Sequence, residues 1–164
     1  MLLYLRHGDD RGENFYRHDR RLNDRGRKEA GKEARRLIDK LGHPDVVYVS
    51  PFRRAKETLA CMADHFERAV ETHCDRRIAQ HLSNKQRKNP SISPQTLELV
   101  AIEEDDAAFR RRVADHVREA RARAQGPLNI WAITHQVVIE EVAEQFDVKI
   151  SGDLDFLDHV VMIG

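Results

Sequence analysis

Three short apolar runs, each followed by polar or charged residues, constrain the fold of this chain most strongly. They cover residues 1–5, 45–49 and 128–133. Runs of this length that are apolar on both faces are typical of strands buried within a parallel sheet. Parallel strands need crossover connections, and the segments between the runs show the apolar spacing of helices. The sequence therefore predicts an α/β fold.

Four amphipathic helices are predicted between and after these strands. Asn23 or Asp24 can cap the first helix, and Gly42 with Pro44 ends it. The apolar positions that define the four helices are Ala30, Ala34, Leu37, Ile38 and Leu41; Ala55, Leu59, Met62 and Phe66; Phe109, Val113, Val117, Ala120 and Ala124; and Val138, Val142 and Phe146. Alternating strands and helices predict a three-layer sandwich, in which helices cover both faces of a mainly parallel sheet.

The chain is expected to form a single domain over residues 1–164. Two weaker patterns predict a short strand at 69–72 and an edge strand at 160–163. Residues 75–94 are basic and polar and show no clear period. We interpret them as a surface loop or cap over a site, because a long loop in a compact domain is usually functional or mobile. A disordered linker is the alternative interpretation.

The charge balance restricts the partners of the chain. Its 28 Lys and Arg residues equal its 28 Asp and Glu residues, which argues against electrostatic binding to nucleic acid or to an anionic membrane. No apolar stretch approaches the roughly 20 residues of a membrane span, and Arg6 and His7 interrupt the apolar start too early for a signal peptide. Cys61 and Cys74 lack the spacing of a disulfide framework or a metal site, so we expect free thiols in a reducing cytoplasm.

Polar groups that suit an anion follow each of the three strong strands. They are Arg6 and His7 after the first run, Ser50 to Arg54 after the second, and Thr134 and His135 after the third. The carboxyl ends of parallel strands meet at one edge of a sheet, and ligands bind there. We therefore expect these side chains to converge on one pocket.

Two histidines and two arginines at one sheet edge favour phosphate chemistry. Guanidinium groups make bidentate contacts to phosphate oxygens, and a neutral imidazole nitrogen can attack phosphorus to form a phosphohistidine. Flanking cations lower the pKa of a histidine and keep it neutral, while a second histidine can donate hydrogen bonds to the phosphoryl oxygens. A zinc site is the rival interpretation, but it needs three or more ligands and arginines oppose a dication. We therefore expect neither a metal nor an organic cofactor.

These motifs, taken in order, resemble the histidine phosphatase superfamily, also called phosphoglycerate-mutase-like. Residues 5–8 (Leu-Arg-His-Gly) look like its signature. Residues 22–26 resemble its Leu-Thr-x-x-Gly helix start, with Asn23 in place of Thr, and residues 50–58 match its Ser-Pro-x-x-Arg-Ala-x-x-Thr pattern. Residues 134–135 (Thr-His) stand where the family has Ser-His-Gly. The chain length and the Arg-His-Gly-Asp start are also similar to short bacterial phosphohistidine phosphatases.

The resemblance implies a metal-independent phosphatase that acts through a phosphohistidine intermediate. His7 is then the nucleophile, and Arg6, Arg54 and His135 bind and stabilise the phosphoryl group. The substrate is a phosphomonoester or a phosphohistidine, carried by a small molecule or a phosphoprotein. Further contacts to the substrate are expected from Gly8, Asp9, Asn14, Gln80 and Thr134.

One departure from the family pattern concerns the proton donor. Gln80 aligns with a glutamate that many members use as general acid, and an amide cannot donate a proton in that way. The other large branch places an acid directly after the second histidine, where this chain has Gln136. Asp9, Asp10 or His81 could act instead, although His81 is expected to be a solvent-facing loop residue. The alternative is a weakly active or inactive module of the same fold that binds phosphate or a phosphoprotein.

Overall fold

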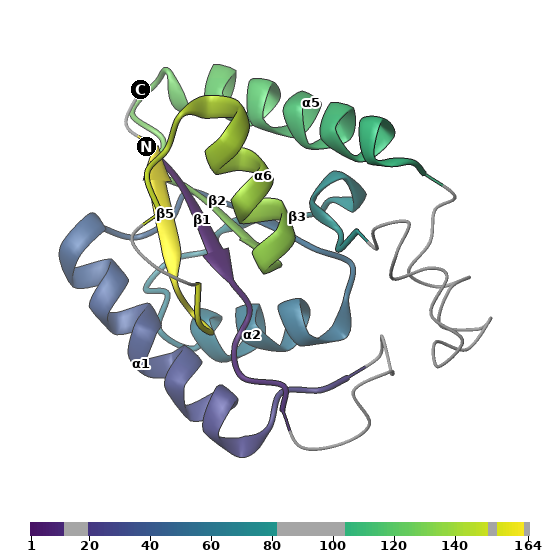
Figure 1. Cartoon of the computed structure of the whole chain (residues 1–164). Helices are drawn as coiled ribbons and strands as arrows, with labels where there is room; N and C mark the ends of the chain where they lie inside the picture. Colours follow the sequence, from purple (N-terminus) through teal and green to yellow (C-terminus); the bar gives the residue numbers. More distant parts are fainter. Residues whose placement is uncertain (12–19, 82–103, 151–153, 163–164) are drawn as a thin grey trace.

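The computed structural model describes residues 1–11, 20–81, 104–150 and 154–162. At its centre lies a five-stranded sheet in the order β3-β2-β4-β1-β5 (Figure 1). The strands are β1 (Leu2–Arg6), β2 (Val46–Val49), β3 (Glu71–Cys74), β4 (Ile130–Thr134) and β5 (His159–Met162). The first four strands run parallel, whereas β5 pairs antiparallel with β1. The prediction of a mainly parallel sheet is confirmed, as is the edge position of the last strand.

Helices cover both faces of this sheet. In the described ranges they are α1 (Asp24–Leu41), α2 (Arg53–Ala63), α5 (Asp106–Ala124) and α6 (Gln136–Phe146), and a 3-10 turn, η1 (Arg76–Ile78), follows β3. The pair α1 and α2 packs on one face, and the pair α5 and α6 packs on the other (Figure 1). The predicted three-layer sandwich is therefore confirmed.

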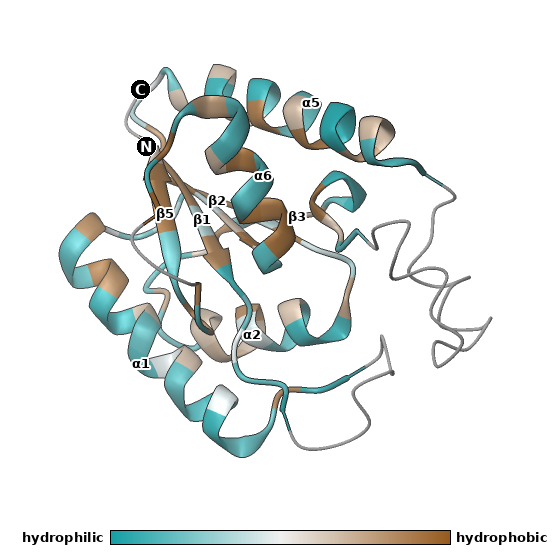
Figure 2. Cartoon of the chain, in the orientation of Figure 1, coloured by the Kyte–Doolittle hydropathy of each residue, from teal (hydrophilic) through white to brown (hydrophobic). Residues whose placement is uncertain are grey.

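Each face of the sheet carries its own apolar core. In β1, Leu3 and Leu5 pack with residues of α1 and α2, whereas Leu2 and Tyr4 pack with residues of α5 and α6. Helices bury both faces of the strand, which accounts for its apolar residues on both faces. Figure 2 shows the corresponding hydrophobic colouring along the strands and on the helices that cover them. The carboxyl end of β1 is consequently held from two sides.

The predicted boundaries of α1 are also confirmed. Asn23 is the N-cap, and its side-chain oxygen accepts a hydrogen bond from the Gly26 amide at 2.7 Å. Gly42 follows the helix with a φ of 83°, a left-handed conformation that glycine adopts without steric cost. The Asn23 amide in turn donates to the Asp9 carbonyl at 3.0 Å, so the start of α1 is fixed against the loop that follows β1.

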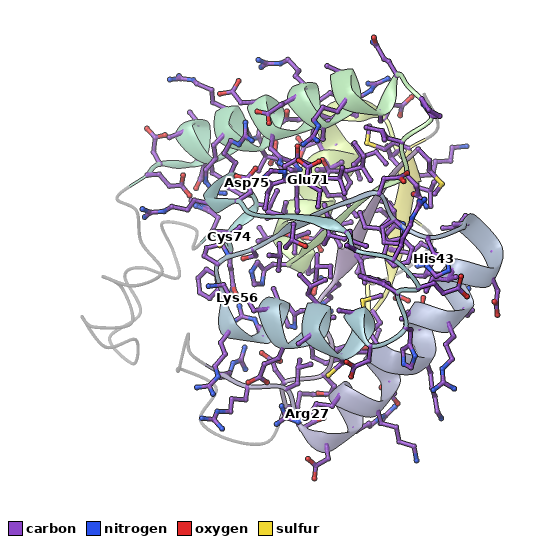
Figure 3. All side chains as sticks on the ribbon, turned by 180° about the vertical axis from the view of Figure 1, so that it is seen from behind. Arg27, His43, Lys56, Glu71, Cys74 and Asp75 are labelled. Atoms are coloured by element: carbon purple, nitrogen blue, oxygen red, sulfur yellow. The ribbon has the colours of Figure 1, made fainter. Side chains whose placement is uncertain are left out.

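Two predictions in the first half of the chain were wrong in detail. The helix predicted to include Phe66 ends at Ala63, and Phe66 lies beyond it with its ring 5.9 Å from that of Trp131. The third strand covers Glu71–Cys74 rather than 69–72, and Figure 3 shows its Glu71 and Cys74 from behind the molecule. This edge strand is mostly exposed, so pairing with β2 fixes its position and apolar spacing carries little information.

The predicted surface excursion at 75–94 begins later than expected. Residues 75–81 pack against the domain, and Ile78 and Ala79 are buried. The cause is Asp75, whose carboxylate accepts from the Arg77 amide at 2.8 Å and lies 2.9 Å from Nδ1 of the buried His116 on α5. Residues 82–94 lie outside the described ranges.

Several arginines of α5 pair with acidic side chains. Arg110 lies near Glu141, Arg118 near Asp115, and Arg123 binds Glu71. In the part of the chain that the structure describes, no helix has the length and apolar character needed to cross a membrane. Both cysteines are free thiols, as predicted.

We expect Gly26→Ala to destabilise the fold because α1 and the loop after β1 touch at this position. A Cβ atom there would lie 2.2 Å from the Asp9 carbonyl oxygen and 2.8 Å from its amide nitrogen. Relief requires the backbone to move, so we expect the free energy of unfolding to fall by about 1–3 kcal/mol in urea denaturation. Gly31→Ala in the same helix is the matched control, since its added methyl meets only the far end of the His65 side chain. Equal stability of the two variants would contradict this account.

Candidate active site

The carboxyl ends of β1 and β4 and the start of α2 surround a pocket of about 570 Å³. The residues of the pocket that matter most for its chemistry are Arg6, His7, Arg54, Gln80, His81 and His135. The predicted convergence of the strand ends is therefore observed for both histidines and both arginines. The parallel register explains it, because Arg6 pairs with Thr134 and brings the residues that follow them side by side.

His7 is held as a neutral imidazole. Its Nδ1 lies 2.9 Å from the Gly8 carbonyl oxygen, and Arg54 Nε donates to its Nε2 at 3.0 Å. The proton therefore belongs on Nδ1 and the lone pair on Nε2, an assignment made from the hydrogen-bond partners. Burial, followed by the charge of Arg54, holds the pKa of His7 well below its usual value. The arrangement keeps Nε2 of His7 unprotonated inside the pocket.

His135 lies beside His7, with the two rings edge to face and their centroids 5.2 Å apart. Its Nε2 lies 2.8 Å from Ser50 Oγ, and its Nδ1 lies 3.2 Å from Nη2 of Arg54. Complete burial, and next the charge of Arg54, holds its pKa well below the usual value as well. Two neutral imidazoles therefore flank one guanidinium.

Arg54 connects the two histidines. Its side chain is 2% exposed, yet it remains charged near neutral pH because burial lowers its pKa only to about 10, with Asp10 Oδ2 3.5 Å from its Nε opposing that shift. Its Nη2 also donates to the side-chain oxygen of Gln80. The same cation thus reaches polar side chains from several segments of the chain.

The residue spacing at the start of α2 supports this position of Arg54. Thr58, one helical turn later, donates to the Arg54 carbonyl at 2.8 Å and accepts from the Gly8 amide at 2.9 Å. The threonine hydroxyl thereby joins α2 to the backbone directly after His7. Arg53, the neighbouring arginine, points elsewhere and binds Glu57 at 3.0 Å.

The remaining predicted site residues occupy different positions. Asp9 does not line the pocket, and its carboxylate binds the amide and guanidinium of Arg11. Thr134 is fully buried, and its hydroxyl donates to the Ile78 carbonyl at 2.7 Å. Asn14 lies outside the described residues.

The expectation that His81 faces solvent was wrong. The residue is 6% exposed, it lines the pocket, and carboxylates of Glu104 and Asp106 lie at its two ring nitrogens. Its ring also stacks on Phe109 with centroids 4.4 Å apart. No local pattern around residue 81 indicates these contacts, because their partners lie more than 20 positions away.

Sequence reasoning missed Phe156, a pocket residue on the loop before β5. The Arg6 guanidinium lies 4.3 Å from the centre of its ring, and that of Arg11 lies 4.8 Å away. The ring thus contacts the guanidinium groups of two arginines that line the pocket. Nothing in the surrounding sequence indicates this role.

Comparison with known proteins identifies the family. The model of the histidine phosphatase superfamily, branch 1, matches residues 2–152. The chain belongs to the histidine phosphatase superfamily. The resemblance deduced from the ordered motifs is therefore confirmed, whereas no curated protein sequence matches the chain significantly.

Several solved structures share the fold of this chain. The protein histidine phosphatase SixA in complex with tungstate has a TM-score of 0.59 at 20% identity, over 87% of this chain and 74% of SixA. The mycobacterial glucosyl-3-phosphoglycerate phosphatase in complex with VO3 has a TM-score of 0.66 at 19% identity, over 96% and 88% of the two chains. YhfR of Bacillus stearothermophilus has a TM-score of 0.65 at 22% identity, over 89% and 79%. At identities this low, the structural similarity shows a common fold and no more.

Two of the buried histidines, His7 and His135, make the stability of this member of the histidine phosphatase superfamily depend on pH. Because the pKa values of His7 and His135 in the folded chain lie well below 6.5, the unfolded chain binds protons below that pH that the folded chain does not. The stabilisation is complete above about pH 6.5 and is lost as the pH falls. We expect the free energy of unfolding to drop by about 1 kcal/mol per histidine and pH unit below that point.

Urea denaturation between about pH 7 and pH 5.5 measures this dependence. His135→Gln removes one of the two groups, so its stability should change less steeply with pH than that of the wild type. The half-buried His73, which lies outside the pocket, gives the control, and His73→Gln should retain the wild-type slope. A flat profile for the wild type would contradict the assignment of neutral buried imidazoles.

Proposed function

We propose that the chain is a metal-independent phosphatase that acts through a phosphohistidine intermediate on His7. The observation that carries this proposal is the hydrogen bonding of His7, which commits Nδ1 to the Gly8 carbonyl and leaves the lone pair of Nε2 toward Arg54. Attack on phosphorus needs an unprotonated nitrogen beside cations that bind the phosphoryl group, and this pocket supplies both.

In the proposed reaction, the phosphoryl oxygens take over hydrogen bonds that Arg54 makes to the two histidines. The Nε2 lone pair of His7 then attacks phosphorus, and the P–N bond forms as the bond to the leaving oxygen breaks. Arg6 and Arg54 stabilise the charge on the phosphoryl oxygens, and His135 contributes hydrogen bonding from the opposite side. Water next attacks phosphorus, the P–N bond breaks, and phosphate leaves.

The proposed substrate is a phosphomonoester or a phosphohistidine, carried by a small molecule or a phosphoprotein. Structures with the same fold support this range, since they include a protein histidine phosphatase, a glucosyl-3-phosphoglycerate phosphatase and a phosphoserine phosphatase of Entamoeba histolytica. We place the reaction in a reducing cytoplasm, which the free thiols of Cys61 and Cys74 support.

In this proposal Gln80 occupies the place of the general-acid glutamate of other family members. Its position in the pocket and its hydrogen bond from Arg54 support this assignment. General acid catalysis contributes about 10²–10⁴-fold to rate, and an amide cannot provide it. The substitution favours a second candidate function, a module that binds phosphate or a phosphoprotein and turns over slowly.

We expect His7→Ala to abolish hydrolysis of an activated aryl phosphate, measured in the presence of a chelator. Nitrophenolate leaves without protonation, so the assay tests the nucleophile independently of any general acid. The wild type and the control His73→Ala, whose histidine lies outside the pocket, should hydrolyse the substrate without added metal. Equal rates for His7→Ala and the wild type would refute the mechanism.

We expect tungstate to raise the thermal midpoint of the wild type, because an oxyanion that binds only the folded state stabilises it. Arg54→Gln should abolish the shift, whereas Arg53→Gln should retain it, since Arg53 binds Glu57 rather than facing the pocket. A midpoint shift without aryl phosphate turnover would favour the binding module. Loss of the shift in both variants, or in neither, would contradict the assignment of Arg54.

A further inference from the structure

The pocket contains an imidazole directly beside the amide that cannot act as an acid. His81 follows Gln80 in the chain, and both residues line the pocket. The hydroxyl of Thr134 binds the Ile78 carbonyl, and this contact holds the segment that carries them against the carboxyl end of β4. His81 is therefore placed by the sheet edge that also places His135.

The contacts of His81 are those of an oriented proton donor. Its Nδ1 lies 3.2 Å from Glu104 and its Nε2 lies 2.8 Å from Asp106. A carboxylate oxygen faces each nitrogen, and both nitrogens can donate only when the ring carries two protons. Stacking on Phe109 at 4.4 Å fixes the plane of the ring.

The two carboxylates differ in exposure to solvent, so the two ring nitrogens of His81 can have different roles. Glu104 is buried, its side chain is 7% exposed, and Arg112 donates to both of its oxygens at 2.6 and 2.7 Å. Asp106 is 60% exposed. The bond to Glu104 is thus fixed, whereas the bond to Asp106 already competes with water and can be exchanged for an oxygen of a bound substrate.

We propose that His81, oriented by Glu104, donates the proton to the leaving oxygen in place of the carboxylic acid that Gln80 cannot provide. The proposal rests on the proposed phosphatase function and extends it to substrates with poor leaving groups. His81 is the catalytic residue in this step, and Glu104 is a positioning residue.

The other acids near the pocket are less suited to this step. Asp10 lies between two cations, 3.0 Å from Arg20 and 3.5 Å from Arg54. Glu140 is exposed and accepts a hydrogen bond from the Gln136 side chain at 2.7 Å. Asp155 is also exposed and accepts from the Phe156 amide at 2.8 Å. Each of these carboxylates is placed to accept a proton or a hydrogen bond rather than to donate one.

The proposed step balances protons and bonds. As His7 Nε2 forms the P–N bond, the P–O bond to the alcohol breaks and its electron pair takes the proton from His81 Nε2. The alcohol departs and His81 is left neutral. In the second step, His81 removes a proton from water as the water oxygen attacks phosphorus, the P–N bond breaks, and hydrogen phosphate and protonated His81 result.

The test compares an alkyl phosphate, glycerol phosphate, with an aryl phosphate, nitrophenyl phosphate. The alkoxide needs a proton to leave, whereas nitrophenolate does not. We expect His81→Asn to lower kcat/KM for glycerol phosphate by about 100-fold or more, and for nitrophenyl phosphate by less than about 5-fold. His73→Asn is the matched control, because His73 also binds a carboxylate but lies outside the pocket. It should retain both activities.

Every outcome of this comparison between the two substrates either supports or overturns the proposed role of His81. An equal loss for both substrates would show that His81 only supports the fold, and an unchanged rate for glycerol phosphate would show that it has no role; either outcome overturns the proposal. Wild-type protein that hydrolyses nitrophenyl phosphate but not glycerol phosphate would also overturn it, while leaving the phosphatase function intact. Hydrolysis of neither substrate would overturn the phosphatase function as well.

One further variant keeps the test informative if His81→Asn fails to fold, and a second variant tests for rescue if it folds. Glu104→Gln preserves the shape of the side chain but removes the orienting charge, and we expect a loss of about 10-fold that is confined to glycerol phosphate. In the His81→Asn background, Gln80→Glu restores a carboxylic acid to the neighbouring position, and we expect it to recover part of the glycerol phosphate activity. Loss of both activities in Glu104→Gln protein with wild-type thermal stability would contradict the selective role.

Discussion

A single buried guanidinium, that of Arg54, organises the candidate active site. Arg54 is 2% exposed, and its donors reach His7, His135 and Gln80. A charge at this depth is tolerated only when hydrogen bonds and a counter-charge such as Asp10 replace the lost water. In the folded chain, His7, His135, Gln80 and Asp10 contribute to meeting that requirement. The need to solvate one cation therefore draws the residues of the candidate site together.

The features that could be predicted from sequence depend on local spacing. The Asn23 cap and the Gly42 end of α1 are set by residues within one helical turn, and they were predicted correctly. The convergence of His7 and His135 follows from parallel strands that share one edge, which requires only the order of strands and helices. The interval between Arg54 and Thr58 is one turn of α2, so the motif itself encodes the contact to the Gly8 amide.

The features that could not be predicted depend on partners distant in the chain. His81 is buried because Glu104 and Asp106 reach it from 23 and 25 positions away. Phe156 reaches the pocket from the loop before β5, and its contact with Arg6 spans nearly the whole sequence. The location of β3 follows from its pairing with β2, since an exposed edge strand has no apolar pattern to fix its register. Such contacts result from tertiary packing, which local propensity does not report.

The order of strands also governs how the molecule is assembled. β1 leads directly into His7, yet its Leu2 pairs with Ile130 on one side and with Met162 on the other. Both neighbours come from the far end of the sequence, so β1 gains its ladder hydrogen bonds only after long loops have closed, which is slow in folding. During that interval an apolar strand has two open edges, a state that favours pairing between separate chains. The strand that leads into His7 is thus exposed to association between chains until β4 and β5 have paired with it.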